Sequence, residues 1–326
     1  MASAKTVVEK ELTSKDWFTR WTWAKKLDFT PTPRQVRRGV MDSNAKVREA
    51  WAERMDFTPT PEQVEYGLTD SEISVKVAWA GRTDFVPTPK QVERGLTDRS
   101  WIIRLRWAAR MDFTPTPEQV ERGLTDKEWV VRSTWAVRMD FVSTPEQVER
   151  GLLDKSIDVQ VAWVLRMDWN PTPELIENGL MSEDWKLRSA WARRMDFTPT
   201  PLQIDRGVSD CNEYVRSAWA VRKDYTPTPE QVERGLRDTS IIVKKEWVLR
   251  RDFTPTPEQI ERGVSDKEPQ IVIAWLCRDD IVWTDSLIRQ GLQHHESFIR
   301  KTWENILERQ RCPEVEISED VSFCSI

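Results

Sequence analysis

The 28 residues from Asp112 to Met139 read Asp-Phe-Thr-Pro-Thr-Pro-Glu-Gln-Val-Glu-Arg-Gly-Leu-Thr-Asp-Lys-Glu-Trp-Val-Val-Arg-Ser-Thr-Trp-Ala-Val-Arg-Met, and this pattern recurs every 28 residues along the chain of 326. One tryptophan keeps its place in eleven copies: Trp23, Trp51, Trp79, Trp107, Trp135, Trp163, Trp191, Trp219, Trp247, Trp275 and Trp303. A fixed period in this range is typical of stacked supersecondary units, none of which can bury its apolar face alone. The sequence therefore predicts a repeat array.

Each copy begins with signals for a short first helix. In the copy that starts at Asp56, residues 57–61 must be extended because a residue before proline is pushed out of the α region. Thr60 then has the place of an N-cap, with Pro61 at the first helical position and Gln63 at the spacing of a capping box. We expect the first helix to run from Pro61 to about residue 66, and Gly67 to form a left-handed C-cap.

A longer second helix is expected to follow, with Asp70 as its N-cap and an end near Thr83. On a helical wheel drawn around Trp51, Val47 and Met55 fall within about 40° of the tryptophan, so these three side chains are expected to form a buried stripe. The opposite side of the helix, at positions two before, two after and five before the tryptophan, varies from copy to copy. A repeat protein usually binds its partner with the face that it varies.

These elements predict an all-α fold, an α-α solenoid of tandem 28-residue two-helix repeats over residues 14–308. Residues 1–13 hold the register of a first helix without its prolines or its glycine, and we expect them to form a degenerate N-terminal cap. Residues 309–326 are acidic after Pro313 and are expected to form a flexible C-terminal tail.

The composition excludes several classes of protein. The 49 basic and 54 acidic residues give a formal net charge of −5, which is neither the basic excess of a nucleic-acid binder nor the field of an acidic tail. No apolar run approaches the roughly 18 residues that a membrane helix requires, and the first residues lack the apolar region of a signal peptide. Four cysteines share neither a repeat position nor a metal-ligand spacing: Cys211, Cys277, Cys312 and Cys324. Scattered thiols suit a reducing compartment, so we predict a cytoplasmic protein without membrane contact.

The charges that recur in every copy are expected to be structural. The position three after the ladder tryptophan holds ten basic residues, from Lys26 to Arg278, and ten aspartates follow two residues later. Aromatics interleaved with arginines are also a signature of single-strand binding, which keeps nucleic acid as the alternative partner. Bases and acids are matched almost one for one, however, which favours ion pairs that set the register between repeats. In the first helix, a glutamate of one repeat can likewise pair with an arginine of the next.

Residues for catalysis are scarce. The two histidines, His294 and His295, are neighbours in the degenerate last repeat, and no Gly-rich phosphate loop is present. A catalytic cluster would have to be unique among nearly identical units, and none stands out. We therefore predict a protein that is not an enzyme and that has no cofactor and no metal site.

Three motifs carry a resemblance to a known family: Val-Arg-Glu-Ala-Trp-Ala at residues 47–52, Thr-Pro-Glu-Gln-Val at 60–64 and Asp-Ser-Glu-Ile-Ser-Val at 70–75. The chain resembles leucine-rich repeat variant proteins, which are HEAT-like α-solenoids, over almost its whole length. The resemblance implies a right-handed superhelix used for binding, without catalysis. Two features depart from the family: the period is four residues longer, and a large tryptophan occupies a place usually held by a small aliphatic residue. The iron–sulfur cysteine cluster that precedes some members is absent.

The variable face of the second helix is the predicted binding site. In the fourth to sixth repeats this face is apolar, and four tryptophans at its rim, six before the ladder position, are further ligand candidates: Trp17, Trp101, Trp129 and Trp185. The predicted partner-binding residues are Trp101, Ile102, Leu105, Ala109, Trp129, Val130, Ser133, Val137, Val161 and Leu165. A contiguous apolar patch on a polar face marks an interaction site more often than chance. We predict a protein-interaction scaffold, with self-association or winding of the array as the other way to cover the patch, and a nucleic-acid-binding HEAT-like solenoid as the alternative.

Overall fold

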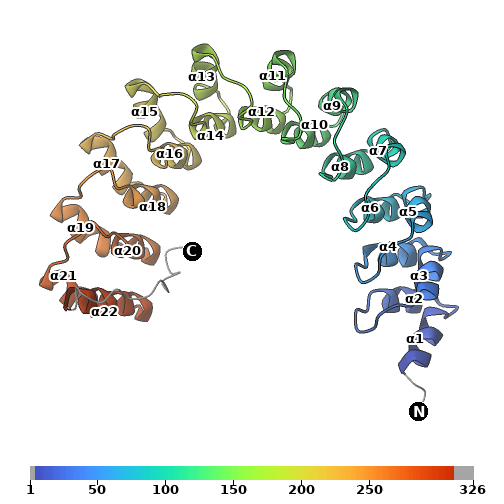
Figure 1. Ribbon diagram of the computed structural model, residues 1–326. Helices are drawn as coiled ribbons and strands as arrows, with labels where there is room; N and C mark the ends of the chain where they lie inside the picture. The colour runs from blue at the N-terminus through green and yellow to red at the C-terminus, as the bar shows by residue number, and fades with distance from the viewer. Residues whose placement is uncertain (1–3, 312–326) are drawn as a thin grey trace. The chain divides into compact units, whose positions relative to one another are not determined.

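The computed structural model describes residues 4–311, and every regular secondary-structure element in that range is an α-helix (Figure 1). The first helices of the repeats are α1 (Ala4–Leu12), α3 (Pro33–Val40), α5 (Pro61–Leu68), α7 (Pro89–Leu96), α9 (Pro117–Leu124), α11 (Pro145–Leu152), α13 (Pro173–Leu180), α15 (Pro201–Val208), α17 (Pro229–Leu236), α19 (Pro257–Val264) and α21 (Asp285–Gly291). The second helices are α2 (Trp17–Ala24), α4 (Ala45–Glu53), α6 (Ile73–Ala80), α8 (Trp101–Ala108), α10 (Trp129–Ala136), α12 (Ile157–Val164), α14 (Trp185–Arg193), α16 (Glu213–Ala220), α18 (Ile241–Leu249), α20 (Pro269–Leu276) and α22 (Ser297–Arg311). The predicted solenoid of tandem two-helix repeats is confirmed.

The array divides by its contacts into two compact units, Met1–Trp169 and Asn170–Ile326. Within each unit the second helices pack directly on one another in chain order, from α2 to α12 in the first unit and from α14 to α22 in the second. Each first helix packs on its own second helix and has much weaker contacts with other first helices (Figure 1). Each unit therefore has two layers, a close-packed layer of second helices and a looser layer of first helices.

The ends of the described chain are helical. At the predicted N-terminal cap, α1 packs on α2 and α3 in the place of a first helix. At the other end α22 runs to Arg311, which is three residues into the segment predicted as a tail, and residues 312–326 lie outside the described part of the chain. Among the described helices, none is long and apolar enough to cross a membrane.

The start of the first helix is as predicted. The Thr60 hydroxyl accepts a hydrogen bond from the Gln63 N–H at 3.3 Å, and the Gln63 side chain accepts one from the Thr60 N–H at 2.9 Å. Two backbone donors that a helix start leaves unpaired are satisfied by this reciprocal arrangement, while Pro61 needs no partner because it has no N–H. The same capping box begins α3, α7, α9, α11, α15, α17 and α19.

The prediction for the repeat glycine is wrong. Gly67 lies inside α5, which continues to Leu68, and no glycine of the described residues has a positive φ. Glycine is required here by close packing, because a Cβ atom on residue 67 would lie 2.1 Å from the Trp79 side chain. The same distance is 2.1–2.2 Å at every repeat glycine from Gly39 to Gly291. The glycine lets the indole of the second helix lie against the backbone of the first.

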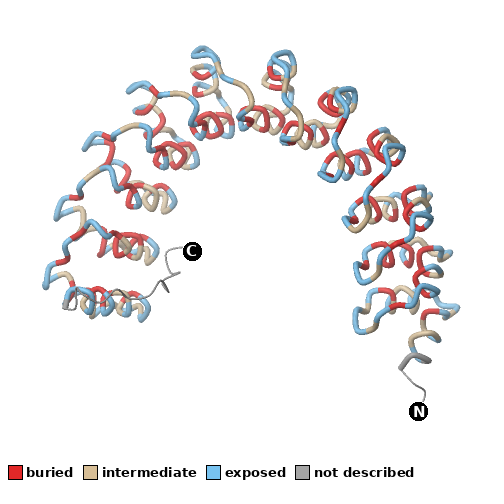
Figure 2. Tube along the Cα trace, viewed as in Figure 1, coloured by how far each residue is buried: buried red, intermediate tan, exposed pale blue. Residues whose placement is uncertain are grey.

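The ladder tryptophans form the core, as predicted. Ten of the eleven are buried, from Trp51 to Trp303, and Trp23 in the first repeat is partly buried. Valines four residues earlier, such as Val47, are buried beside them. The buried residues in Figure 2 lie where the two layers of helices meet. The indole rings of the ladder tryptophans therefore pack between helices.

The second helix begins later than predicted. The N-cap position before α6 is held by Glu72, and Asp70 does not cap the helix. The Asp70 carboxylate instead accepts the Glu72 N–H at 2.9 Å, inside the turn that precedes the helix. Aspartate readily forms such a side-chain turn two residues before a helix, so its presence alone does not mark the cap.

The second helix also ends earlier than predicted, which corrects the assignment of the methionine. In the repeat of Trp51, α4 ends at Glu53 because Arg54 has an extended backbone, with φ −74° and ψ 130°. A helical wheel cannot predict which side chains are buried after that residue, because the backbone there is no longer helical. Met55, predicted to lie in the buried stripe, is 55% exposed.

Candidate interaction surface

The arginine three after the ladder tryptophan ties each repeat to the one before it. Arg138 is 2% exposed. Its Nη1 donates to the carbonyl oxygen of Ala108 at 2.7 Å and to that of Arg110, while Nε and Nη2 donate to the Asp140 carboxylate. The same contacts recur at Arg54, Arg82, Arg110, Arg166, Arg222, Arg250 and Arg278. These guanidinium groups satisfy carbonyls at the end of a second helix, so they are structural.

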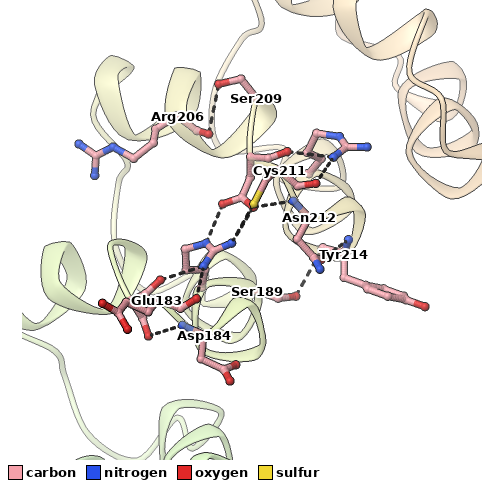
Figure 3. A network of polar contacts seen from close by, with 12 residues as sticks. Glu183, Asp184, Ser189, Arg206, Ser209, Cys211, Asn212 and Tyr214 are labelled. Atoms are coloured by element: carbon pink, nitrogen blue, oxygen red, sulfur yellow. Dashed lines mark hydrogen bonds and ion pairs between the residues drawn. The ribbon is translucent and has the colours of Figure 1, made fainter.

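The basic residue three before the tryptophan forms a second ladder between repeats. In the second unit, Arg188 makes a bidentate ion pair with Asp210 of the next repeat at 2.7 and 2.8 Å, and donates to the carbonyl oxygens of Ser182 and Glu183. Asp210 also accepts the N–H of Asn212 at 2.8 Å, in the turn drawn in Figure 3. Equivalent pairs are Arg20–Asp42, Arg48–Asp70, Lys76–Asp98, Arg104–Asp126, Arg132–Asp154, Arg216–Asp238 and Lys244–Asp266. The predicted networks that set the register between repeats are confirmed.

A third, more exposed ladder joins the first helices. Arg122 pairs with Glu93 of the preceding repeat at 2.6 Å, with both side chains nearly half exposed. Pairs of the same kind are Arg94–Glu65, Arg150–Glu121 and Arg206–Glu177. The predicted pairing of a glutamate in one repeat with an arginine in the next is confirmed.

These contacts change the acidity of the carboxylates. The hydrogen bond from Arg94 lowers the pKa of the Glu65 carboxyl to about 2. At Asp168, burial acts to raise the pKa, but the hydrogen bonds from Arg166 and from the Ser143 N–H outweigh it and bring the pKa to about 2. The pKa of Asp126 is lowered by the same balance between burial and its Arg104 partner. The folded chain therefore binds fewer protons in acid than the unfolded chain does.

The array should lose stability in acid. A carboxyl whose pKa is lower in the folded state contributes stability above its unfolded pKa, and this contribution is lost as the pH falls through the folded pKa. We expect the melting temperature to fall steadily between about pH 5 and pH 2 in low-salt buffer, followed by circular dichroism. Asp126→Asn should melt lower at neutral pH and show a smaller acid slope. A melting temperature that stays constant or rises as the pH falls would contradict this reading of the ladders.

The predicted partner-binding residues lie on the surface of the first unit. Their helices α8, α10 and α12 pack side by side. Six of these residues are exposed, namely Trp101, Ile102, Ala109, Trp129, Val137 and Leu165, and four are partly buried, namely Leu105, Val130, Ser133 and Val161. Leu105 and Val130 also pack against the core. All ten belong to these three consecutive second helices or to the C-cap residues that end them.

The four rim tryptophans are exposed as predicted. Trp17, Trp101, Trp129 and Trp185 have 37–45% of their surface accessible. In the second unit Trp185 stacks on Tyr214 of the next second helix, with ring centroids 5.1 Å apart. Trp101 and Trp129 are thus the two rim tryptophans that border the apolar face of α8, α10 and α12.

Three further apolar residues of these repeats are exposed methionines, at the position that the helical wheel assigned to the buried stripe. Met111, Met139 and Met167 are 62%, 61% and 55% exposed and follow the ends of α8, α10 and α12. A signal for their exposure was present in the sequence, because the same repeat position holds Thr83, Lys223, Arg251 and Asp279. A position that accepts lysine and aspartate does not lie in a buried stripe. We call the following set the apolar patch: Trp101, Ile102, Leu105, Ala109, Met111, Trp129, Val130, Val137, Met139, Val161, Leu165 and Met167.

A groove of about 580 Å³ opens over α6, next to the apolar patch. The α6 residues that line it include Ile73, Ser74, Val77 and Ala78, with Gly81 at the end of the helix. Glu49 and Glu53 of α4 line one side, and Ile102 and Arg106 of α8 line the other. Ile102 therefore belongs to both the groove and the apolar patch.

Features of a catalytic or metal site are few. Over residues 4–311, no three His, Cys, Asp or Glu side chains lie together where they could hold a metal ion. His294 and His295 precede α22 with their rings stacked 4.4 Å apart. Cys312 and Cys324 lie outside the described residues.

Together, the repeats and this surface define the class of the protein: an α-solenoid repeat protein whose ladder residues are used for stacking. No protein-family model and no curated protein matches the chain. Among solved structures, the chain is similar to a leucine-rich repeat variant with a novel repetitive structural motif, at 19% identity over 75% of this chain and 85% of that one, with a TM-score of 0.42. It is also similar to Escherichia coli YibA, at 16% identity over 92% of this chain and 99% of that one, with a TM-score of 0.32. The tandem helical repeats of the structure agree with the fold that the resemblance to leucine-rich repeat variant proteins implies.

Proposed function

We propose that the protein is a non-enzymatic scaffold that binds another protein through the apolar patch. The observation that carries the proposal is the continuity of exposed apolar side chains over three neighbouring second helices. The charged side chains that α8, α10 and α12 add to this face are Arg106 and Asp158. An exposed apolar surface of this kind, with aromatic and methionine side chains, is typical of a protein interface.

The ladders support a protein partner over a nucleic acid. Phosphate binding depends on cations that are free to release counterions. The buried arginines of the ladders donate instead to backbone carbonyls and to aspartates, as Arg138 does to Asp140. We also propose a cytoplasmic location, which the scattered positions of the cysteines support.

A charge placed on the apolar patch should abolish binding without unfolding the array. Val137 and Leu165 are 57% and 48% exposed, so glutamate at both positions keeps its carboxylate in water in the free protein. In an interface the same carboxylates would lose their water, so Val137→Glu with Leu165→Glu should reduce binding of a partner captured from a cell lysate about tenfold or more. The melting temperature should stay within about 2 °C of the wild type, because exposed substitutions have small effects.

The matched control is Val86→Glu, an 83% exposed valine in the loop before α7 of the same unit. It should keep both the melting temperature and the retained partner. Leu105 is unsuitable for this test because it packs against the core. Equal retention by the double variant and by the control would rule out the patch as the binding site. Binding to heparin that falls steeply with salt would instead indicate nucleic acid.

A further inference from the structure

We propose that the occupant of the apolar patch is an amphipathic α-helix with acidic residues along one edge, lying across α8, α10 and α12. The inference rests on the proposed function and adds the chemistry of the partner. It follows from three properties of the face: its lack of polar groups, its spacing and its charge at one edge.

The lack of polar groups favours a helix over an extended segment. A bound peptide must satisfy its backbone N–H and C=O groups, and a helix does this internally whereas an extended chain does not. The second helices beneath the patch provide few partners, since the Thr134 hydroxyl already donates to the Val130 carbonyl at 2.7 Å. Ser133, Arg106 and Asp158 are the other polar side chains there. An extended segment would leave most of its backbone groups unpaired against apolar side chains.

The spacing of the repeats matches the rise of a helix. Packed helices lie about 10 Å apart, and seven residues of an α-helix rise about 10.5 Å. A partner helix that crosses α8, α10 and α12 would therefore present one heptad to each repeat, and about 21 residues would cover the patch. The patch is also about as wide as one helix, because the eight residues of α8 or α10 span about 12 Å.

Basic residues at one edge of the apolar patch indicate that the partner helix has acidic residues on the side that faces them. The loops before α8, α10 and α12 each hold one exposed basic residue at the same repeat position, namely Arg99, Lys127 and Lys155. None of these three side chains has an ion pair with the described residues. At the equivalent position the flanking repeats have Ser43, Ser71, Glu183 and Cys211. The basic edge thus coincides with the apolar patch, and an acidic residue in each heptad of the partner would face it.

Three fluorescent peptides of about 21 residues test the proposal. The first has leucines at heptad positions with one glutamate in each heptad beside them. The second has the same composition with leucine at every second residue, which is the pattern of an extended amphipathic segment. The third is the first with those glutamates replaced by lysine. Fluorescence anisotropy measures the binding of each peptide to the full chain, to Val137→Glu and to Lys127→Glu with Lys155→Glu.

The heptad peptide with glutamates should bind the wild type most tightly, and both other peptides should bind about tenfold more weakly. Val137→Glu should lose the heptad peptide, and the variant with glutamate at residues 127 and 155 should prefer the lysine peptide. Equal or tighter binding of the alternating peptide, indifference to the sign of the edge charge, or absence of binding by the heptad peptide would overturn the inference. Tighter binding of a single-stranded oligonucleotide of about 20 thymidines, lost in the same variants, would also overturn it.

The two proposals fail differently. If the heptad peptide does not bind but Val137→Glu with Leu165→Glu still loses a captured protein that Val86→Glu retains, the helix is wrong and the proposed function stands. If neither substitution at the patch changes any binding, the proposed function is wrong as well.

Discussion

Replacing Arg138 by methionine is expected to lower the free energy of unfolding by about 3–5 kcal/mol, the usual effect of removing one partner of a buried ion pair. The substitution leaves the Asp140 carboxylate without its cation and the carbonyl oxygen of Ala108 without its donor. It also removes the guanidinium group from between two rings of the same repeat, Phe113 at 4.9 Å and Trp135 at 5.0 Å. Methionine restores the packing volume but none of these contacts.

The control for this variant is Arg122→Met, which breaks the exposed pair with Glu93. An exposed ion pair contributes about 0–1 kcal/mol, so the control should unfold almost as the wild type does. Urea titration followed by circular dichroism gives both free energies. Similar losses in the two variants would mean that the buried arginine ladder does not hold the repeats together.

Replacing Gly123 by alanine is expected to destabilise the array by about 1–3 kcal/mol, the range for an overpacked core. This loss of stability is the opposite of the usual effect, because alanine inside a helix is normally more favourable than glycine by about 1 kcal/mol. Here the new Cβ would lie 2.2 Å from Nε1 of Trp135. The buried indole cannot yield without disturbing the layer of second helices.

Gly81→Ala is the matched control, because Gly81 ends α6 instead of lying against a tryptophan. A Cβ at this position would meet its nearest atom, the Val77 carbonyl oxygen, at 3.4 Å, an ordinary contact. Alanine should therefore raise the stability by about 0.4–1 kcal/mol through the lower entropy of the unfolded chain. Thermal and urea unfolding of both variants measure the difference. A stabilising effect of alanine at residue 123 would disprove the close contact between glycine and tryptophan.

Periodicity and charge pairing were enough to predict the repeat architecture and its core. A tryptophan at the centre of an apolar stripe in every copy is buried for the same reason in every copy, as Trp135 and Trp163 are. Bases and acids that recur in equal numbers form pairs because buried charge must be compensated. Both arguments depend on the composition of a position over many repeats, and they are insensitive to where a helix ends.

Local rules failed where contacts between helices decide the structure. Gly67 satisfies the sequence pattern of a C-cap, but its role is set by Trp79, twelve residues away on another helix. The wheel placed Met55 in the core because it assumed a helix that continues past Arg54, whose side chain turns instead to the preceding repeat. The sequence patterns did not predict a role for Arg99, Lys127 and Lys155, because these basic residues lie in loops outside both helical patterns.

The most direct test of the apolar patch as the binding surface is methionine oxidation by peroxide, read by mass spectrometry on the chain alone and with its captured partner bound. Met111, Met139 and Met167 are more than half exposed on the patch, while Met41 and Met181 follow first helices and are 44% and 58% exposed. We expect all five to oxidise in the free chain and only the first three to be protected in the complex, about tenfold if the interface excludes water. Unchanged oxidation of Met111, Met139 and Met167 in the complex, or protection of Met41 and Met181 instead, would show that the partner binds elsewhere.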